Sequence, residues 1–258
     1  MDIERTHEAC QLTPRPVAAM ASSHMDGEFI SPHHHPRAQL VHAIAGVMTV
    51  RCPQGSWVVP SGRAVWMPAG MDHSIRISGQ VEMRTAFVAP DARPGLPSTC
   101  EVIEVSALLL ALLVSATRIP FEYDTYGRDG RIMELILDEV QSARRLSMHV
   151  PMPQHPRLAT LCERLIADPS APATLEELAG GLAMSGRTLA RLFHSELGMS
   201  FGEWRRRMRL LLSLPRLAAG TSILEVALEH GYQSPSAFAA MFKKTFGVAP
   251  SRYLDDLA

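Results

Sequence analysis

The stretch Ser185-Gly-Arg-Thr-Leu-Ala-Arg-Leu-Phe-His-Ser-Glu-Leu-Gly198 has a counterpart 49 residues later, Ser234-Pro-Ser-Ala-Phe-Ala-Ala-Met-Phe-Lys-Lys-Thr-Phe-Gly247. Each copy opens on a serine suited to a helix N-cap, has apolar residues at helical spacing, and ends on a glycine suited to a left-handed C-terminal residue. Each copy also follows a shorter segment with a capping-box pattern, Leu175–Ala183 and Ile223–His230. A short helix, a tight turn and a longer helix form a helix-turn-helix. The repeat therefore predicts two such motifs, at about residues 174–197 and 222–246.

A helix over Ser200–Ala219 is predicted between the two copies, because Ser200 and Glu203 form a capping-box pattern ahead of apolar residues at helical spacing. At about 1.5 Å per residue, such a helix spans roughly 28 Å. This length approaches the ~34 Å between successive major-groove faces of B-DNA. We expect Pro215 to kink the helix or end it early. The alternative interpretation is a helical bundle with no role in binding nucleic acid.

The residues from Gly231-Tyr232 through Phe238 and Phe242 to Tyr253 resemble the C-terminal signature of the AraC/XylS-type transcription regulators. The resemblance covers about residues 155–258, and it implies an all-α domain over 157–258 that binds promoter DNA in adjacent major grooves. It also implies which residues contact the bases: Arg187, Thr188, Ala190 and Arg191 in the first recognition helix, and Ser234, Ser236, Ala239 and Ala240 in the second. The alternative for any one of them is a solvated surface position without a role.

The two recognition helices differ in chemistry. Arg187 and Arg191 can form paired hydrogen bonds to guanine, whereas serine and alanine can only touch thymine methyl groups or phosphate. We therefore expect the first helix to provide most of the base discrimination. Lys243 and Lys244 are expected to bind phosphate.

The composition sets limits on the rest of the chain. Its 258 residues are 47% hydrophobic, which is enough for two domains with buried cores. The net charge of −1 divides into −3 over residues 1–154 and +2 over residues 155–258, so DNA binding is expected to rely on specific contacts or on a dimer. Four cysteines without a Cys-x-x-Cys pair predict free thiols in a reducing compartment. The sequence shows neither a signal-peptide pattern nor an apolar run of ~20 residues, which predicts a cytoplasmic protein without membrane contact.

The N-terminal part has a different pattern. Residues 1–15 are polar and unpatterned, which predicts a flexible arm. Residues 16–100 contain short strand patterns separated by glycine and proline turns, and many short strands with regular turns indicate an all-β sandwich or small barrel. The predicted strands are Leu40–Ala45, Val47–Arg51, Trp57–Val59, Ala64–Met67, Ser74–Ile77 and Glu82–Phe87.

Two motifs in this region, His33-x-His35-x3-Gln39-x6-Gly46 and Gly62-x5-Pro68-x-Gly70-x2-His73, resemble those of the cupin fold. The resemblance implies a metal site in the barrel formed by His33, His35, Gln39 and His73. His33 and His35 alternate on one predicted strand and so face the same side, whereas His34 faces away.

The chain departs from the cupin pattern at two positions. Gln39 stands where catalytic cupins usually have glutamate, and an amide oxygen is a poorer ligand for a divalent cation than a carboxylate. Ile77 stands where the second motif has asparagine. Three interpretations of the histidines therefore stay open: ligands of a divalent metal ion, contacts to an organic effector, or hydrogen-bonded structural residues.

Residues 101–148 contain two apolar helix patterns, at about Val105–Thr117 and Arg128–Leu146. Helices this apolar need a partner. They can pack on their own barrel or on a second subunit, and we favour a homodimer. Residues 149–156, with three prolines, are expected to link the domains.

Taken together, the patterns predict a multidomain protein with an N-terminal all-β cupin-like barrel, central helices and a C-terminal all-α double helix-turn-helix domain. The function they predict is a sequence-specific transcription regulator controlled by a small molecule or metal ion in the barrel. A cupin isomerase or oxygenase fused to a DNA-binding tail is the alternative from another class, and it would require a carboxylate at position 39. A constitutive architectural DNA binder with an inert barrel is the third interpretation.

Overall fold

The computed structural model describes residues 6–255, which form two compact units. Of the described residues, the first unit comprises 6–52 and 59–148, and the second comprises 53–58 and 149–255. Within the described residues, no helix is long and apolar enough to cross a membrane.

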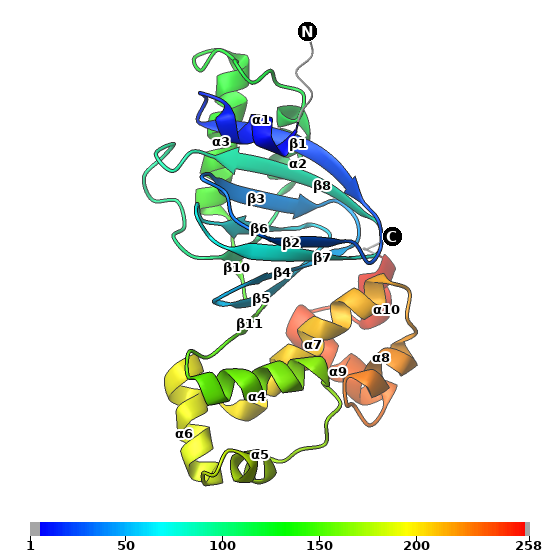
Figure 1. The fold of residues 1–258 in the computed structure, drawn as a ribbon. Helices are drawn as coiled ribbons and strands as arrows, with labels where there is room; N and C mark the ends of the chain where they lie inside the picture. Colours follow the sequence, from blue (N-terminus) through cyan, green and yellow to red (C-terminus); the bar gives the residue numbers. More distant parts are fainter. Residues whose placement is uncertain (1–5, 256–258) are drawn as a thin grey trace. The chain divides into compact units, whose positions relative to one another are not determined.

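The first unit contains two antiparallel sheets (Figure 1). One sheet has six strands, and their order is β1 (Val17–His24), β8 (Val81–Val88), β3 (Ala38–Ala43), β6 (Arg63–Met67), β9 (Glu101–Glu104) and β10 (Arg145–Leu146). In the other sheet, β7 (His73–Ser78) pairs with both β4 (Val47–Cys52) and β2 (Phe29–His33). Five of the predicted strands in this unit match β3, β4, β6, β7 and β8 within a few residues. The strand pattern thus predicted most of the β-rich fold.

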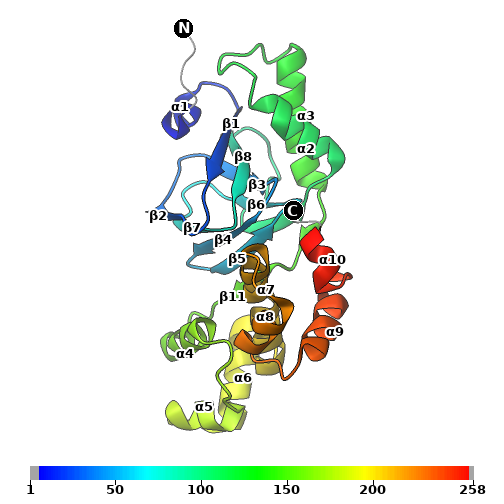
Figure 2. The ribbon, with the colours of Figure 1, turned by 90° about the vertical axis from the view of Figure 1, so that its right-hand side faces the viewer.

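The two central helices, α2 (Ala107–Ala116) and α3 (Arg128–Ser142), cover one face of the six-stranded sheet (Figure 2). Alternate strand residues such as Leu40 and Trp66 form a buried core with Leu113 and Ile136 of these helices. The helices therefore pack on the sheet of their own unit. The second predicted helix ends at Ser142, because Arg145–Leu146 turns into the edge strand β10.

The expected flexible arm over residues 1–15 is wrong for residues 7–12. They form helix α1 (His7–Leu12), which is capped by the Thr6 hydroxyl accepting from Ala9 N–H. Cys10 is fully buried on this helix and packs with Ala18 and Phe87. Residues 1–5 of the predicted arm lie outside the described residues.

Up to residue 255, the second unit is helical apart from one strand pair. β11 (His149–Pro151) pairs with the first residues of β5 (Gly55–Pro60), so the predicted linker is partly a strand. The helices of the unit are α4 (Pro156–Ala167), α5 (Leu175–Gly181), α6 (Gly186–Leu197), α7 (Phe201–Ala218), α8 (Ile223–Glu229), α9 (Pro235–Phe246) and α10 (Pro250–Asp255). Pro215 does not end α7 early, and the helix continues to Ala218.

Candidate functional site

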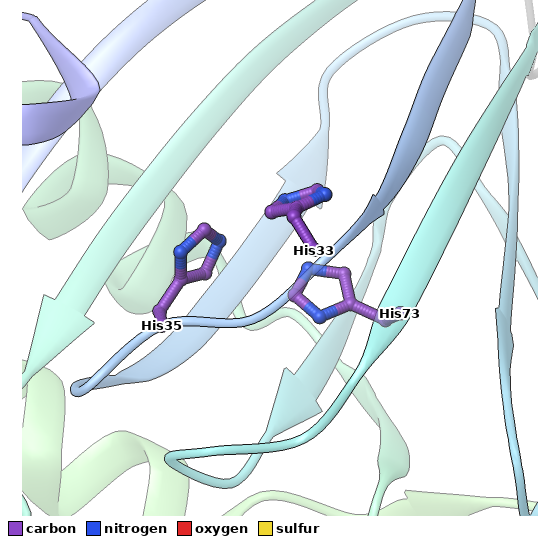
Figure 3. Close-up of side chains that lie close together, drawn as sticks. All are labelled: His33, His35 and His73. Atoms are coloured by element: carbon purple, nitrogen blue, oxygen red, sulfur yellow. The ribbon is translucent and has the colours of Figure 1, made fainter.

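Three histidines of the first unit lie together at the ends of β2 and β7 (Figure 3). His33 is the last residue of β2 and is paired in register with His73, the first residue of β7. His35 follows β2 and lies opposite them. One potential ligand atom from each of the three side chains lies within 4.8 Å of the others.

Backbone hydrogen bonds fix the tautomers of two of these rings. His33 Nδ1 lies 2.6 Å from the carbonyl oxygen of Ser31, and His73 Nδ1 lies 2.8 Å from that of Met71. A carbonyl oxygen can only accept, so both Nδ1 atoms are protonated and both Nε2 atoms present a lone pair. Among the described residues, the buried His73 Nε2 has no hydrogen-bond partner. Such a backbone contact to one ring nitrogen is the usual way in which a protein orients a metal-binding histidine.

The surroundings of His35 and His73 favour the neutral form of both rings. Burial, together with the nearby His7, His33, His73 and His34, lowers the pKa of His35 to about 3. Burial also lowers the pKa of His73, against the raising effect of its bond to Met71. A metal ion binds the neutral imidazole, so little proton competition is expected at these two rings near neutral pH.

Gln39, the fourth predicted ligand, is on β3 in the other sheet. It pairs in register with Phe87, so the two side chains leave the same face of that sheet. Phe87 makes ring contacts with His35, and Gln39 Oε1 is buried without a hydrogen-bond partner among the described residues. Gln39 therefore faces the same interior as the histidines, and no described contact joins it to them.

The expectation that His33 and His35 alternate on one strand is wrong in detail. A register shift lies between Ile30 and His33, β2 ends at His33, and His35 lies in the connection to β3. The two rings nevertheless meet, with centroids 4.7 Å apart. His34 points elsewhere, as expected, and its Nδ1 lies 3.1 Å from Asp72 Oδ1.

The sequence patterns missed His7, a fourth histidine beside this cluster. His7 Nε2 lies 3.2 Å from His35 Nε2, and the two ring centroids are 4.2 Å apart. No motif spacing identifies His7, because it belongs to a separate short helix. The hydroxyl-containing Thr6 directly before it was the available signal for a helix start.

The second unit contains both predicted helix-turn-helix motifs, with the short helices α5 and α8 packed on the longer helices α6 and α9. Ser185 and Ser234 cap α6 and α9, and Gly198 and Gly247 end them in the left-handed conformation. The capping boxes at Thr174/Glu177 and Ser200/Glu203 are complete. At Ser222 the side chain accepts from Glu225 N–H.

Most of the predicted DNA contacts are exposed. On α6 these are Arg187, Thr188 and Arg191, and on α9 they are Ser236, Ala240, Lys243 and Lys244. Ala190 and Ala239 are only partly accessible, and the Ser234 hydroxyl is occupied as the cap of α9. The 49-residue offset also pairs His194 and Ser195 with the two lysines, and all four are exposed. His194 and Ser195, in the C-terminal half of α6, are not among the predicted DNA contacts.

Two half-buried arginines of α7 hydrogen-bond to the backbone near both helix-turn-helix motifs. Arg205 of α7 donates to the carbonyl oxygens of Ala171 and Ala173 ahead of α5. Arg209 donates to Pro169 and Gly231, the latter just ahead of α9. α7 is thus tied to the segment before α5 and to the turn before α9, and these two arginines are structural.

Comparison with known proteins gives two matching families. The AraC-like ligand binding domain family matches residues 16–201, and a helix-turn-helix domain family matches residues 178–256. The HTH-type transcriptional regulator NimR of Escherichia coli is 33% identical over 228 residues, which is 88% of this chain and 83% of that protein. The regulator RipA of Corynebacterium glutamicum is 30% identical over 141 residues, or 53% of this chain and 40% of that one.

Among solved structures, ToxT from Vibrio cholerae aligns over 95% of this chain and 100% of its own, with 13% identity and a TM-score of 0.41. The curated relatives named above are transcription regulators, and they give no support to the alternative of an enzyme fused to a DNA-binding tail.

Proposed function

The chain belongs to the AraC family of DNA-binding transcription regulators, and from this premise we propose that a divalent transition-metal ion held by His33, His35 and His73 controls its binding to promoter DNA. The chain is a regulator with an N-terminal ligand-binding domain, and it is not an enzyme. The identity of the ligand and the residues that contact DNA are the parts that we propose.

One observation supports the metal ion above all: a buried Nε2 lone pair without a hydrogen-bond partner, on His73, is directed into a cluster with two further imidazoles. Leaving such an atom unpaired costs about 1–3 kcal/mol, so it is expected to have a partner in the working protein. Imidazole ligands suit Zn²⁺, Cu²⁺, Ni²⁺ and Fe²⁺. The donors thus fit a late first-row divalent ion.

The bound ion would supply a cross-link. His33 ends β2, His73 begins β7, and His35 lies in the connection to β3, so holding all three rings restrains one end of the β-rich unit. The ion can change DNA affinity only by the difference between its affinities for the DNA-binding and non-binding arrangements of the chain. Base discrimination then comes mainly from Arg187 and Arg191, with phosphate contacts from Lys243 and Lys244.

Metal content and DNA affinity, measured on the same samples, test the proposal. Protein purified without an affinity tag is analysed by mass spectrometry for metal per chain, beside His33→Ala/His73→Ala and the control His34→Ala. We expect near-stoichiometric metal in the wild type and in the control, and loss of metal in the double variant. A chelator is expected to change the affinity for promoter DNA in the wild type and in His34→Ala but not in the double variant.

A metal-free wild type that still binds promoter DNA would contradict the proposal, and it would point to an organic effector at the same residues. Metal that remains in the double variant would also contradict it.

We further propose that the chain is a homodimer that acts in the cytoplasm, where the promoter DNA of a bacterial cell lies. Support for a dimer comes from two exposed leucines on the helices that cover the six-stranded sheet. Leu108 of α2 is 50% exposed and Leu135 of α3 is 41% exposed.

A further inference from the structure

His7 stands at the solvent side of the three-histidine cluster. It is the first residue of α1, while the other three histidines come from β2, its connection to β3, and β7. Its Nε2 lies 3.2 Å from His35 Nε2, and its ring centroid lies 6.3 Å from that of His33. The ring is exposed, whereas His35 is only 5% exposed.

The His7–His35 spacing has the value expected for two ligands of one ion. Nitrogen atoms bound to a tetrahedral ion at about 2.0–2.1 Å are about 3.3–3.4 Å apart. Without an ion, one neutral ring would have to donate its Nε2–H to the Nε2 lone pair of the other, whereas an ion can bind both Nε2 lone pairs.

Helix α1 holds His7 in this position. Cys10, one turn further on, is fully buried against Phe87, and the His7 ring contacts the same Phe87 edge-on with centroids 5.0 Å apart. The guanidinium of Arg37 donates to the carbonyl oxygens of Gln11 and Thr13 at the C-terminal end of the helix. A cation at that end also opposes the negative end of the helix dipole. The helix is thus docked at both ends.

We infer that His7 supplies the fourth nitrogen ligand of the metal site, in the place that the cupin pattern gives to residue 39. The inference rests on the proposed metal-dependent function. Three protein ligands with an open position are typical of catalytic zinc sites, whereas four protein ligands are typical of closed structural ones. A four-histidine site would have no position left for a substrate. It would also make docking of α1 depend on the ion.

Metal titrations of a set of single variants test the role of His7. The affinity for Zn²⁺ is measured by competition with a chromophoric chelator for the wild type, His7→Ala, His34→Ala and His33→Ala/His73→Ala. Removing an outer-shell partner already costs about 10–100-fold in metal affinity, so losing a direct ligand is expected to cost at least tenfold. His34→Ala should bind as the wild type does, and the double variant should not bind.

Two further measurements distinguish a residue that binds the ion directly from one that only lies near it. Co²⁺ bound to the wild type should show the intense visible absorption of a four-coordinate ion with nitrogen ligands, and His7→Ala should show a different, weaker spectrum. Amide exchange of Cys10, whose N–H donates to Thr6 O in α1, should slow on adding Zn²⁺ in the wild type and not in His7→Ala. Because the buried anchors of α1 are unchanged, His7→Ala is expected to stay folded.

The possible failures are distinct. If His7→Ala and His34→Ala bind Zn²⁺ equally well and give the wild-type Co²⁺ spectrum, the inference on His7 is wrong and the three-histidine site stands. If the wild type binds no more metal than His33→Ala/His73→Ala, the proposed metal-dependent function itself fails.

Discussion

At the residue scale, the two recognition helices have the same geometry and different chemistry. Exposed positions 187 and 191 of α6 correspond to exposed positions 236 and 240 of α9, because both pairs keep the 49-residue offset. The first helix places arginines there, and the second places Ser236 and Ala240. The structure therefore presents two equivalent surfaces, of which only the first offers groups that form paired hydrogen bonds to a base edge at these positions.

We predict that Arg187→Ala or Arg191→Ala weakens binding to the preferred operator by about 1–3 kcal/mol and relaxes discrimination at a G·C base pair. Ser236→Ala, at the position matched to Arg187, should change discrimination much less. Lys243→Ala should weaken binding to all sequences alike and reduce the salt dependence by about one phosphate contact. The measurement is competition fluorescence anisotropy with an operator selected from random duplexes and its single-base variants. Equal loss of discrimination in Ser236→Ala and Arg187→Ala would refute the asymmetry.

His149 is a half-buried base next to a cation in the second unit. Its ring stacks on Trp57 at a centroid distance of 5.7 Å, and its Nδ1 lies 3.2 Å from Arg207 Nη2. Burial, and then the charge of Arg207, lower the pKa of His149 to about 4 from its usual value near 6.5. The unfolded chain therefore binds more protons than the folded chain between about pH 4 and 6.5, so this residue lowers stability as the pH falls through that window.

We predict that this effect amounts to about 1–3 kcal/mol between pH 6.5 and 4, after allowance for partial exposure to solvent. His149→Gln should lack this part of the pH dependence, whatever its stability at pH 7. The measurement is the opening free energy of α7 from hydrogen exchange of peptides within residues 201–218 at several pH values. Parallel pH profiles for the wild type and the variant would contradict the prediction.

At the element scale, the sequence predicted those helices whose ends are set by residues close to them in the chain. Serine and threonine caps, the two C-terminal glycines and the apolar stripes placed α5 to α9 because each of these signals acts within a few residues. Of the two effects expected of Pro215, a kink or an early end, the early end is wrong. Pro215 deprives the Leu211 carbonyl of its helical N–H donor, yet α7 continues because Leu214 and Leu217 on either side are buried in the core.

The elements that the sequence did not reveal depend on contacts between distant residues. Helix α1 exists because Cys10 meets Phe87, and its end is held by Arg37. β11 exists because Val150 pairs with Ser56. The candidate site divides in the same way: the cupin pattern located His33, His35 and His73, but His7 reaches the cluster through a helix with no motif of its own.

The helices α2 and α3 lead to a prediction about assembly. Their inner faces are buried on the six-stranded sheet, while Leu108 and Leu135 stay exposed. If this face forms the dimer, Leu108→Glu or Leu135→Glu would bury a carboxylate in the interface and should weaken dimerisation at least tenfold without unfolding the chain. Sedimentation velocity over a concentration series measures this. Leu224→Glu, on α8 and 56% exposed, is the matched control and should dimerise as the wild type does. A monomeric wild type would contradict the proposal.

At the scale of the whole molecule, the candidate ligand site and the helices proposed to contact DNA lie in separate compact units of one chain. The DNA-binding half has a net charge of only +2, so non-specific attraction to DNA is modest. A regulator of this kind gains most from a ligand that shifts the balance between two arrangements of the chain, since a small shift is not masked by strong non-specific binding. The size of that shift is a coupling free energy, and it has the same value for the effect of the ion on DNA binding and of DNA on ion binding.

The common coupling free energy gives a quantitative prediction. If the ion raises operator affinity by a given factor, the operator must raise metal affinity by the same factor, because both measure one coupling free energy; a tenfold effect corresponds to about 1.4 kcal/mol. Operator affinity is measured with saturating Zn²⁺ and with chelator, and Zn²⁺ affinity with and without saturating operator, at one salt concentration and pH. The His33→Ala/His73→Ala variant should show no coupling in either direction. If Zn²⁺ changes operator affinity but saturating operator leaves Zn²⁺ affinity unchanged, the ion must act at a different site. Linkage at one site changes both affinities by the same factor.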